Sequence, residues 1–314
     1  MAEKIERKPD VSLVVVFYNI PREAPRTLHS LSAAYQRHIG LDDYEIIVVD
    51  NGSSPPLDPQ LVASLSGNFR LIRIDDAHPS PAQALNRGLA EARGDVIGVM
   101  IDGARVVTPG LLHFARHAAR LYDRAVVATL GWYLGPDFQW RAMESGYDRA
   151  REDALLASID WPNDGYRLFE IGSMDESSVD GWFKPIAESN ALFLRREFWD
   201  LLGGLDERFD AAGGGLLNLD TFNRALEWPD AELVILLGEA TFHQLHGGTN
   251  TNIPLLQQHD NWTRWGAQYA AIRGRAYEIA QPRHPPTCLG TLPGPILARF
   301  AQAAKQLEQS PIAP

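Results

Sequence analysis

Residues 1–130 alternate short runs of apolar, mostly β-branched residues with segments of helical length. Strands are expected at the apolar runs and helices between them. Such alternation is typical of a parallel sheet with crossover helices, so the chain is predicted to belong to the α/β class. The expected strands are residues 11–17, 44–50, 69–74, 96–101 and 125–130, and the expected helices are residues 24–38, 58–64, 81–92 and 109–122.

The pattern changes after residue 130. Residues 132–187 are rich in Trp, Tyr, Gly and acidic residues and show no clear sheet period, so we interpret them as an insertion that carries a helix near residues 140–157. Regular elements resume beyond it. Further strands are expected at residues 190–194, 232–237 and 240–245, and further helices at residues 197–201, 218–227, 253–279 and 296–309, with five prolines in residues 281–295.

The composition excludes several classes of protein. The 29 basic and 40 acidic residues give a formal net charge of −11, which opposes nonspecific attraction to nucleic acid or anionic lipid. A single cysteine excludes an internal disulfide framework. The sequence has no run of about 18 apolar residues, and its charged N-terminus does not resemble a signal peptide, so we expect a cytoplasmic protein without evident membrane association.

Motifs of other nucleotide-binding and hydrolytic folds are absent from the sequence. No Gly-x-Gly-x-x-Gly follows the first expected strand, and no Gly-x-x-x-x-Gly-Lys-Ser/Thr occurs, so neither a dinucleotide fold nor a P-loop is supported. The absence of a Gly-x-Ser-x-Gly elbow disfavours a hydrolase. Phosphate would therefore be bound by a metal, by basic side chains or by loop amides.

Polar residues follow four of the expected strands. Asn19 follows the first strand and Asp50 ends the second. Asp75 follows the third strand and Asp102 the fourth. Each of these residues, taken alone, also suits a turn or a helix cap. Because ligands of open α/β sheets bind at the carboxyl ends of the strands, their joint placement predicts a ligand site whose carboxylates require a cation or ligand hydroxyls.

Several segments resemble the family-2 glycosyltransferases. Residues 11–19, which end in Tyr-Asn, are similar to the first strand of that family. Residues 44–53, with the sequence YEIIVVDNGS, resemble its second strand, whose Asp50 would hold the nucleobase. The resemblance extends in the order of the family from residue 11 to residue 249. The further similar segments are residues 81–102, 188–196, 202–209 and 242–249.

The resemblance implies a divergent member of the family with a GT-A fold, an α/β architecture in which helices flank a mixed central sheet. It implies a catalytic domain at residues 8–250. A nucleotide-binding half would occupy residues 8–130, and an acceptor half with the insertion 132–187 would occupy residues 131–250. Residues 251–314 would form a helical, proline-containing C-terminal extension.

The activity that the resemblance implies is the transfer of a sugar such as a hexose from a nucleotide-sugar donor, with a UDP-sugar favoured. The acceptor would be a glycan, a lipid-linked molecule or a small molecule, as in polysaccharide biosynthesis. The family uses Mg²⁺ or Mn²⁺ to neutralise the departing diphosphate. The alternative is a catalytically silent GT-A domain that binds a glycan or a partner enzyme.

Individual residues are assigned through the same resemblance. The metal ligands would be Asp102 and His246. His243 is expected to point away from the metal, because residues three apart on a strand lie on opposite faces. The donor-binding residues implied by the resemblance are Phe17, Asn19, Asp50, Asn86 and Asp102.

The second acid of the family's Asp-x-Asp motif is missing. Ala104 stands at that position and has no donor atom, which makes this chain a variant of the motif. Metal binding would then be weakened, shifted onto Asp102 and His246, or replaced by a basic side chain such as Arg105 acting on the diphosphate.

The acid that takes the proton of the acceptor hydroxyl in the family is also missing, because Asn218 stands at its position. An amide cannot act as a general base. Asp220 is therefore the expected catalytic residue, with Glu188 and Asp206 as alternatives. The stereochemical outcome stays open, since the stretch around Asn218 also resembles the retaining polypeptide N-acetylgalactosaminyltransferases.

Overall fold

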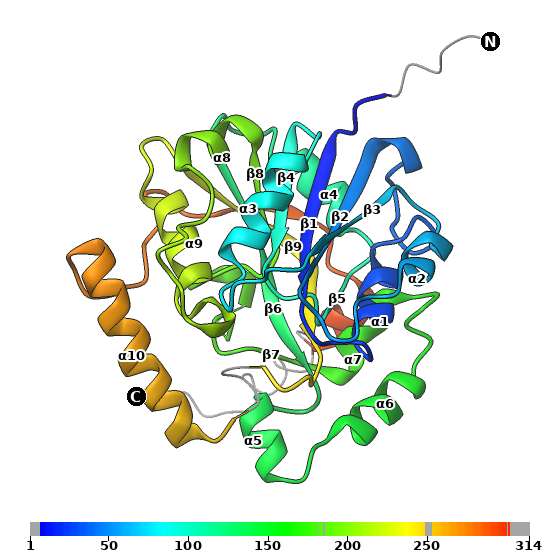
Figure 1. Ribbon diagram of the computed structural model, residues 1–314. Helices are drawn as coiled ribbons and strands as arrows, with labels where there is room; N and C mark the ends of the chain where they lie inside the picture. The colour runs from blue at the N-terminus through cyan, green and yellow to red at the C-terminus, as the bar shows by residue number, and fades with distance from the viewer. Residues whose placement is uncertain (1–6, 180, 185, 249–252, 300, 302–314) are drawn as a thin grey trace, which may run out of the picture.

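A computed structural model describes residues 7–179, 181–184, 186–248, 253–299 and 301. Within these residues ten strands form one mixed sheet, in the order β10-β9-β6-β8-β4-β1-β2-β3, with β5 paired to β9 and β7 paired to β6 (Figure 1). The strands are β1 (Val11–Phe17), β2 (Tyr44–Asn51), β3 (Phe69–Ile74), β4 (Val96–Met100), β5 (Arg105–Val107), β6 (Ala125–Leu134), β7 (Gly172–Met174), β8 (Leu192–Arg195), β9 (Glu232–His243) and β10 (Thr287–Gly290).

Helices cover both faces of this sheet (Figure 1). One apolar core lies between the sheet and α1 (Ala24–Ser30), α2 (Pro59–Ser64) and α4 (Leu111–Ala118). The opposite core contains residues of α3 (Ala82–Glu91), α8 (Arg196–Leu202) and α9 (Leu217–Glu227). The other helices are α5 (Gln139–Glu144), α6 (Arg149–Ala157), α7 (Leu168–Ile171) and α10 (Leu255–Arg273).

Strand β1 shows why the sheet is central. Val14 and Val16 belong to one core, whereas Leu13 and Val15 belong to the other, so both faces of the strand are buried. Such two-sided burial is characteristic of parallel strands covered by helices, and β1 pairs in parallel with both β2 and β4. The expected mixed central sheet flanked by helices is confirmed.

The strands expected in the first 130 residues are all present, but three short strands were not expected. β5 and β7 have three residues each, and β10 lies in the proline-rich segment. Each of them pairs with a strand distant in the sequence. No local alternation marks so short a strand, because its position is fixed by its partner.

Several helices are shorter than the apolar pattern predicts. The helix expected at residues 24–38 ends at Ser30, whose hydroxyl bonds the carbonyl of Thr27 and accepts from the N–H of Val107 on β5. The single helix expected near residues 140–157 is interrupted at Gly146, which has a φ of 83°. The helix expected at 253–279 ends before Gly274, also in the left-handed region.

Two strands were expected at residues 232–237 and 240–245, but the structure has a single strand there, β9. It runs from Glu232 to His243, and Gly238 within it has a φ of 78°. A Cβ at this position would lie 1.9 Å from the carbonyl oxygen of Thr291. The glycine thus lets the strand bend where the chain beyond β10 passes close to it, and the pairing of β9 with β6 shifts register nearby.

The C-terminal segment is not only helical. β10 pairs in parallel with β9 and forms one edge of the sheet. The chain is helical at residues 294–299, and most of the helix expected at 296–309 lies outside the described residues. The division into a domain and an extension at residue 250 stays a prediction. Among the described helices, none has the length and apolar character that crossing a membrane requires.

A buried carboxyl group links β9 to the start of α4. Glu239 is fully buried, and its two oxygens accept from the Tyr166 hydroxyl at 2.7 Å and from the N–H of Gly110 at 3.1 Å. Burial raises the pKa of Glu239 to about 7. The folded chain therefore holds a proton on Glu239 over a pH range in which the unfolded chain has lost it.

We expect Glu239→Gln to flatten the dependence of stability on pH. Because the folded pKa lies above the unfolded one, stability is highest at acidic pH and falls as pH rises from about 4.5 to about 7, by on the order of 3 kcal/mol. An uncharged Gln cannot show this loss. Urea unfolding at pH 5 and pH 8 measures it, and equal losses in both proteins would contradict the assignment.

Candidate active site

The carboxyl ends of β4, β1 and β2 lie next to one another, because these strands are parallel neighbours. β9 runs in the same direction and ends at His243. The antiparallel pairing of β5 with β9 places Arg105 opposite His243. The turn that contains Asp102 is thereby held against the end of β9, although the two segments are more than a hundred residues apart.

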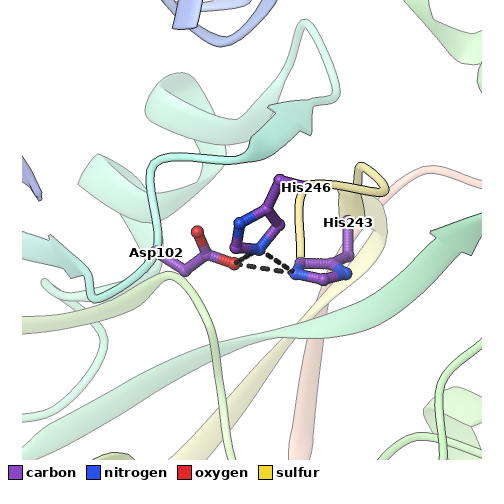
Figure 2. A group of neighbouring side chains, drawn as sticks. All are labelled: Asp102, His243 and His246. Atoms are coloured by element: carbon purple, nitrogen blue, oxygen red, sulfur yellow. Dashed lines mark hydrogen bonds and ion pairs between the residues drawn. The ribbon is translucent and has the colours of Figure 1, made fainter. Parts of the chain in front are cut away.

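Three side chains with metal-binding atoms meet at this position (Figure 2). One oxygen of Asp102, Oδ2, lies 2.9 Å from Nε2 of His243 and 3.5 Å from Nε2 of His246. The two imidazole nitrogens are 3.0 Å apart. An aspartate oxygen and two imidazole nitrogens within reach of one another are a set of ligands suited to a divalent transition metal.

Hydrogen bonds orient the ring of His243. Its Nδ1 lies 2.8 Å from Oε1 of Gln139, while Nε2 of Gln139 donates to the His243 carbonyl at 3.0 Å. Nδ1 therefore carries the proton, and Nε2 has a lone pair facing Asp102. Burial, reinforced by the positive charge of Arg105, lowers the pKa of His243 to about 4, so the ring is neutral at physiological pH.

The charges of Asp102 and His246 stabilise each other. Burial opposes a charge on Asp102, but the positive charge of His246 outweighs burial and holds the pKa of Asp102 well below its usual value. Burial likewise opposes a charge on His246, and the negative charge of Asp102 outweighs it and raises the pKa of His246. Without a metal, a proton on His246 balances the aspartate.

Arg105 adds a second cation beside this cluster. Its side chain is 7% exposed, and its Nε lies 3.8 Å from Oδ2 of Asp102. Neither Nε nor Nη1 has a hydrogen-bond partner among the residues that the structure describes. A buried guanidinium with unused donors is costly unless a ligand completes it, and an anionic ligand would do so best.

Both histidines reach the cluster, contrary to the expectation that only His246 would. His243 is the last residue of β9, so the alternation of a strand no longer applies beyond it. The chain bends at His246, three residues beyond the end of the strand. The position of His243 was missed because the end of β9 could not be located from the sequence.

Phe17, Asn19 and Asp50 lie at the adjacent strand ends. Phe17 pairs with Asp50 in the register of β1 and β2, and its ring packs so closely on Gly103 that a Cβ there would lie 2.7 Å from it. The N–H of Asn19 donates to the Ser53 hydroxyl at 3.0 Å. These contacts fix the loops at the end of β1 and β2 relative to the turn at Asp102.

Asp50 is occupied by contacts within the protein. One oxygen accepts from the N–H of Ser53 at 3.0 Å, and the other accepts from the N–H of Leu57 at 2.9 Å and from Arg73 at 2.7 Å. Burial opposes its charge, yet these bonds prevail and lower the pKa of Asp50. The carboxylate therefore shapes the loop that follows β2, and a direct contact with a nucleobase stays a prediction.

Asn86 faces a different part of the molecule. Its amide donates to the carbonyl of Leu205 at 2.9 Å and to Glu207 at 2.8 Å, and its oxygen accepts from the N–H of Leu205. These contacts tie α3 to the loop after α8. The structure does not join Asn86 to the metal-ligand cluster, and its role in donor binding stays a prediction.

Asp220 lies in a buried ion pair. It is fully buried on α9, and its two oxygens accept from Nε and Nη2 of Arg273 at 2.6 and 2.7 Å. Arg273 also contacts Asp206 at 2.7 Å. This two-point contact favours a structural role for Asp220, namely holding the end of α10 against α9. The catalytic role predicted for Asp220 stays untested.

A different carboxylate lies beside Asn218. The Asn218 amide donates to Oε2 of Glu188 at 2.6 Å and to the Ser189 carbonyl at 3.3 Å. Glu188 precedes β8 and is half-buried. Glu188 was named from the sequence as an alternative to Asp220, and its contact with Asn218, 30 residues away in the sequence, is what the structure adds.

Comparison with known proteins gives one family. The sequence profile described as glycosyl transferase family 2 matches residues 12–181, more than half of the chain. No curated protein matches the sequence.

Solved structures of TarS from S. aureus are similar to this chain at low identity. TarS 1–349 is 14% identical, with 84% of this chain and 72% of that chain covered and a TM-score of 0.43. TarS 1–349 in complex with UDP is 13% identical, with 83% and 72% covered and a TM-score of 0.43. A longer TarS chain is 14% identical, with 83% and 43% covered and a TM-score of 0.46.

We expect the cluster to bind Mn²⁺ through both histidines. His243→Gln and His246→Gln should each weaken binding by about ten-fold or more, because each removes a nitrogen ligand. Isothermal titration calorimetry with Mn²⁺ measures this, and His259→Gln, on the exposed side of α10, is the matched control. Unchanged affinity in His243→Gln would show that only His246 binds the metal.

We expect Asp220→Asn to lower the free energy of unfolding by about 3 to 5 kcal/mol, because an amide presents a donor to Arg273 where a carboxylate accepted. Arg273→Gln should cost a similar amount. The double variant should cost far less than the two losses combined, since both changes break the same pair. Urea unfolding of the three variants tests this. If the losses in free energy of unfolding of the two single variants simply add in the double variant, the structural role of Asp220 is contradicted.

Proposed function

Since this chain belongs to glycosyl transferase family 2, we propose that it transfers a sugar from a nucleotide-sugar donor, with a UDP-sugar as the first candidate, to a carbohydrate, lipid-linked or small-molecule acceptor. The observation that carries this proposal is the convergence of Asp102, His243, His246 and Arg105 at one edge of the sheet. A dication and a buried guanidinium together suit the diphosphate of such a donor.

The residues of the cluster fit a divalent cation. Two imidazole nitrogens and one carboxylate oxygen favour Mn²⁺ over Mg²⁺, which prefers ligands that are all oxygen. Asp102, His243 and His246 would hold the ion and leave positions for phosphate oxygens. When bound, the ion would neutralise charge on the departing diphosphate. Gln139 would keep Nε2 of His243 deprotonated for this role.

Arg105 would bind the diphosphate directly. Its unpaired donors and its position beside Asp102 support this role. A guanidinium binds two phosphate oxygens through parallel N–H bonds of fixed geometry, an arrangement that the ammonium group of lysine does not have. In the family, the second acid of the Asp-x-Asp motif helps to bind a metal, whose positive charge balances the diphosphate. Ala104 cannot bind a metal, so Arg105 would supply part of that positive charge here.

The remaining donor contacts are proposed at the ends of β1 and β2. Phe17, Asn19 and Asp50 would form the wall that receives the nucleoside, since their loops are fixed against the turn at Asp102. Asn86 would act at a distance, through the loop at residues 205–207.

A catalytically silent domain is the second candidate. Two observations favour it, namely the replacement of acids of the family by Ala104 and Asn218. Such a domain would bind the nucleotide or a glycan without breaking the bond between sugar and diphosphate. Release of nucleoside diphosphate from a nucleotide sugar, measured with the purified chain, separates the two candidates.

We expect UDP with Mn²⁺ to raise the melting temperature of the chain by several degrees, because the ligand binds only the folded state. Asp102→Asn and Arg105→Gln should each abolish most of this shift. Differential scanning fluorimetry with UDP, GDP and TDP measures it and ranks the nucleobases.

Asp123→Asn is the control for these variants, since Asp123 is a 94% exposed carboxylate that pairs with Arg195 outside the site. Its shift should equal that of the unaltered chain. If none of the nucleoside diphosphates raises the melting temperature, with or without Mn²⁺, nucleotide-sugar binding at this site is refuted.

A further inference from the structure

The position at which the family has its catalytic acid is occupied here by an amide that holds another carboxylate. Asn218 lies in the first turn of α9. Its Nδ2 donates to Oε2 of Glu188 at 2.6 Å, which is short for an amide hydrogen bond. The second bond of the same nitrogen, to the Ser189 carbonyl, fixes the orientation of the amide. Asn218 thus binds and directs the Glu188 side chain.

The surroundings of Glu188 suit a group that accepts a proton. Burial and the neighbouring negative charge of Asp175 raise its pKa, while Asn218, Arg105 and Asn190 act in the opposite direction. The antiparallel pairing of β8 with β4 sets Leu192 opposite Val99, so the segment before β8 that contains Glu188 lies at the carboxyl end of β4, the edge of the sheet that carries Asp102. The residue as a whole is half-buried.

The other carboxylates considered for this role are engaged more tightly. Both oxygens of Asp220 are bound by Arg273, and Asp220 has no exposed surface. Asp206 contacts Arg208 at 2.6 Å and Arg273 at 2.7 Å, and these arginines lower its pKa strongly. Carboxylates locked to arginines are weak bases. Glu188 instead has amide partners.

We propose that Glu188 is the general base of the sugar transfer and that Asn218 is its positioning residue. This inference rests on the proposed function. Glu188, from another segment of the chain, would then perform the role of the acid that is missing at position 218. Asn218, which replaces that acid, would hold Glu188 in place. The reaction would then invert the configuration of the anomeric carbon, because the base assists a direct attack.

The step balances without any further reactant. The acceptor oxygen forms a bond to the anomeric carbon, and the bond from that carbon to the diphosphate oxygen breaks. The electron pair of the broken bond stays on the diphosphate. Arg105, together with a cation held by Asp102, His243 and His246, would balance the negative charge of the diphosphate. The proton of the acceptor hydroxyl moves to the Glu188 carboxylate.

The test is Glu188→Gln, which keeps an oxygen that can accept from Asn218 but cannot take a proton. Hydrolysis of UDP-sugars by the purified chain with Mn²⁺ is followed by UDP release, water serving as acceptor. Turnover should fall by at least about 100-fold, while UDP affinity and melting temperature stay unchanged. The rise of turnover with pH that ionisation of Glu188 causes should disappear. Glu170→Gln, an exposed carboxylate outside the site, is the control.

A second variant separates a base from a merely structural residue. Glu188→Gln combined with Asn218→Asp returns a carboxylate to the position used by the family, and should recover about ten-fold or more of the lost turnover. Turnover that survives Glu188→Gln, or a loss explained by a lower melting temperature, overturns the assignment of Glu188. UDP binding without hydrolysis of any UDP-sugar by the unaltered chain overturns both this assignment and sugar transfer, and leaves the silent domain.

Discussion

The short antiparallel ladder between β5 and β9 is the interaction on which the site depends. It sets Arg105 opposite His243, and the next link, from the N–H of Gln244 to the Ala104 carbonyl at 2.8 Å, continues it past the end of β9. This pairing brings the turn after β4 to two histidines from the far end of the chain. Without it, Asp102 would be a strand-end carboxylate with no histidine beside it.

The sequence predicts the part of the molecule that local patterns determine. β1, β2 and β4 follow from their apolar runs, and the parallel order of these strands places Asn19, Asp50 and Asp102 at one edge. The place of His243 depends on where β9 ends, and the bond between Asn218 and Glu188 depends on how the start of α9 packs against the segment before β8. Such contacts depend on tertiary packing, which no local period reveals.

Asp220 is a second residue whose surroundings depend on a contact that the sequence does not reveal. Its position near the start of α9 and its acidity make it a reasonable base on sequence grounds. Its partner Arg273 is 53 residues away, at the end of a helix whose place in the fold the sequence does not specify. Ala104 is also informative, because its side chain belongs to the apolar core, where a carboxylate would lose hydration that only a bound cation could replace.

The position of β10 at the edge of the sheet affects how the chain folds during its synthesis. Strands β1 to β9 are all synthesised before residue 287, yet residues 234–237 of β9 acquire their outer neighbour only when residues 287–290 have left the ribosome. Until then this part of β9 exposes unpaired amides and carbonyls, the surface on which strands of other molecules add. During synthesis this part of the edge is therefore open to such addition until β10 pairs with it.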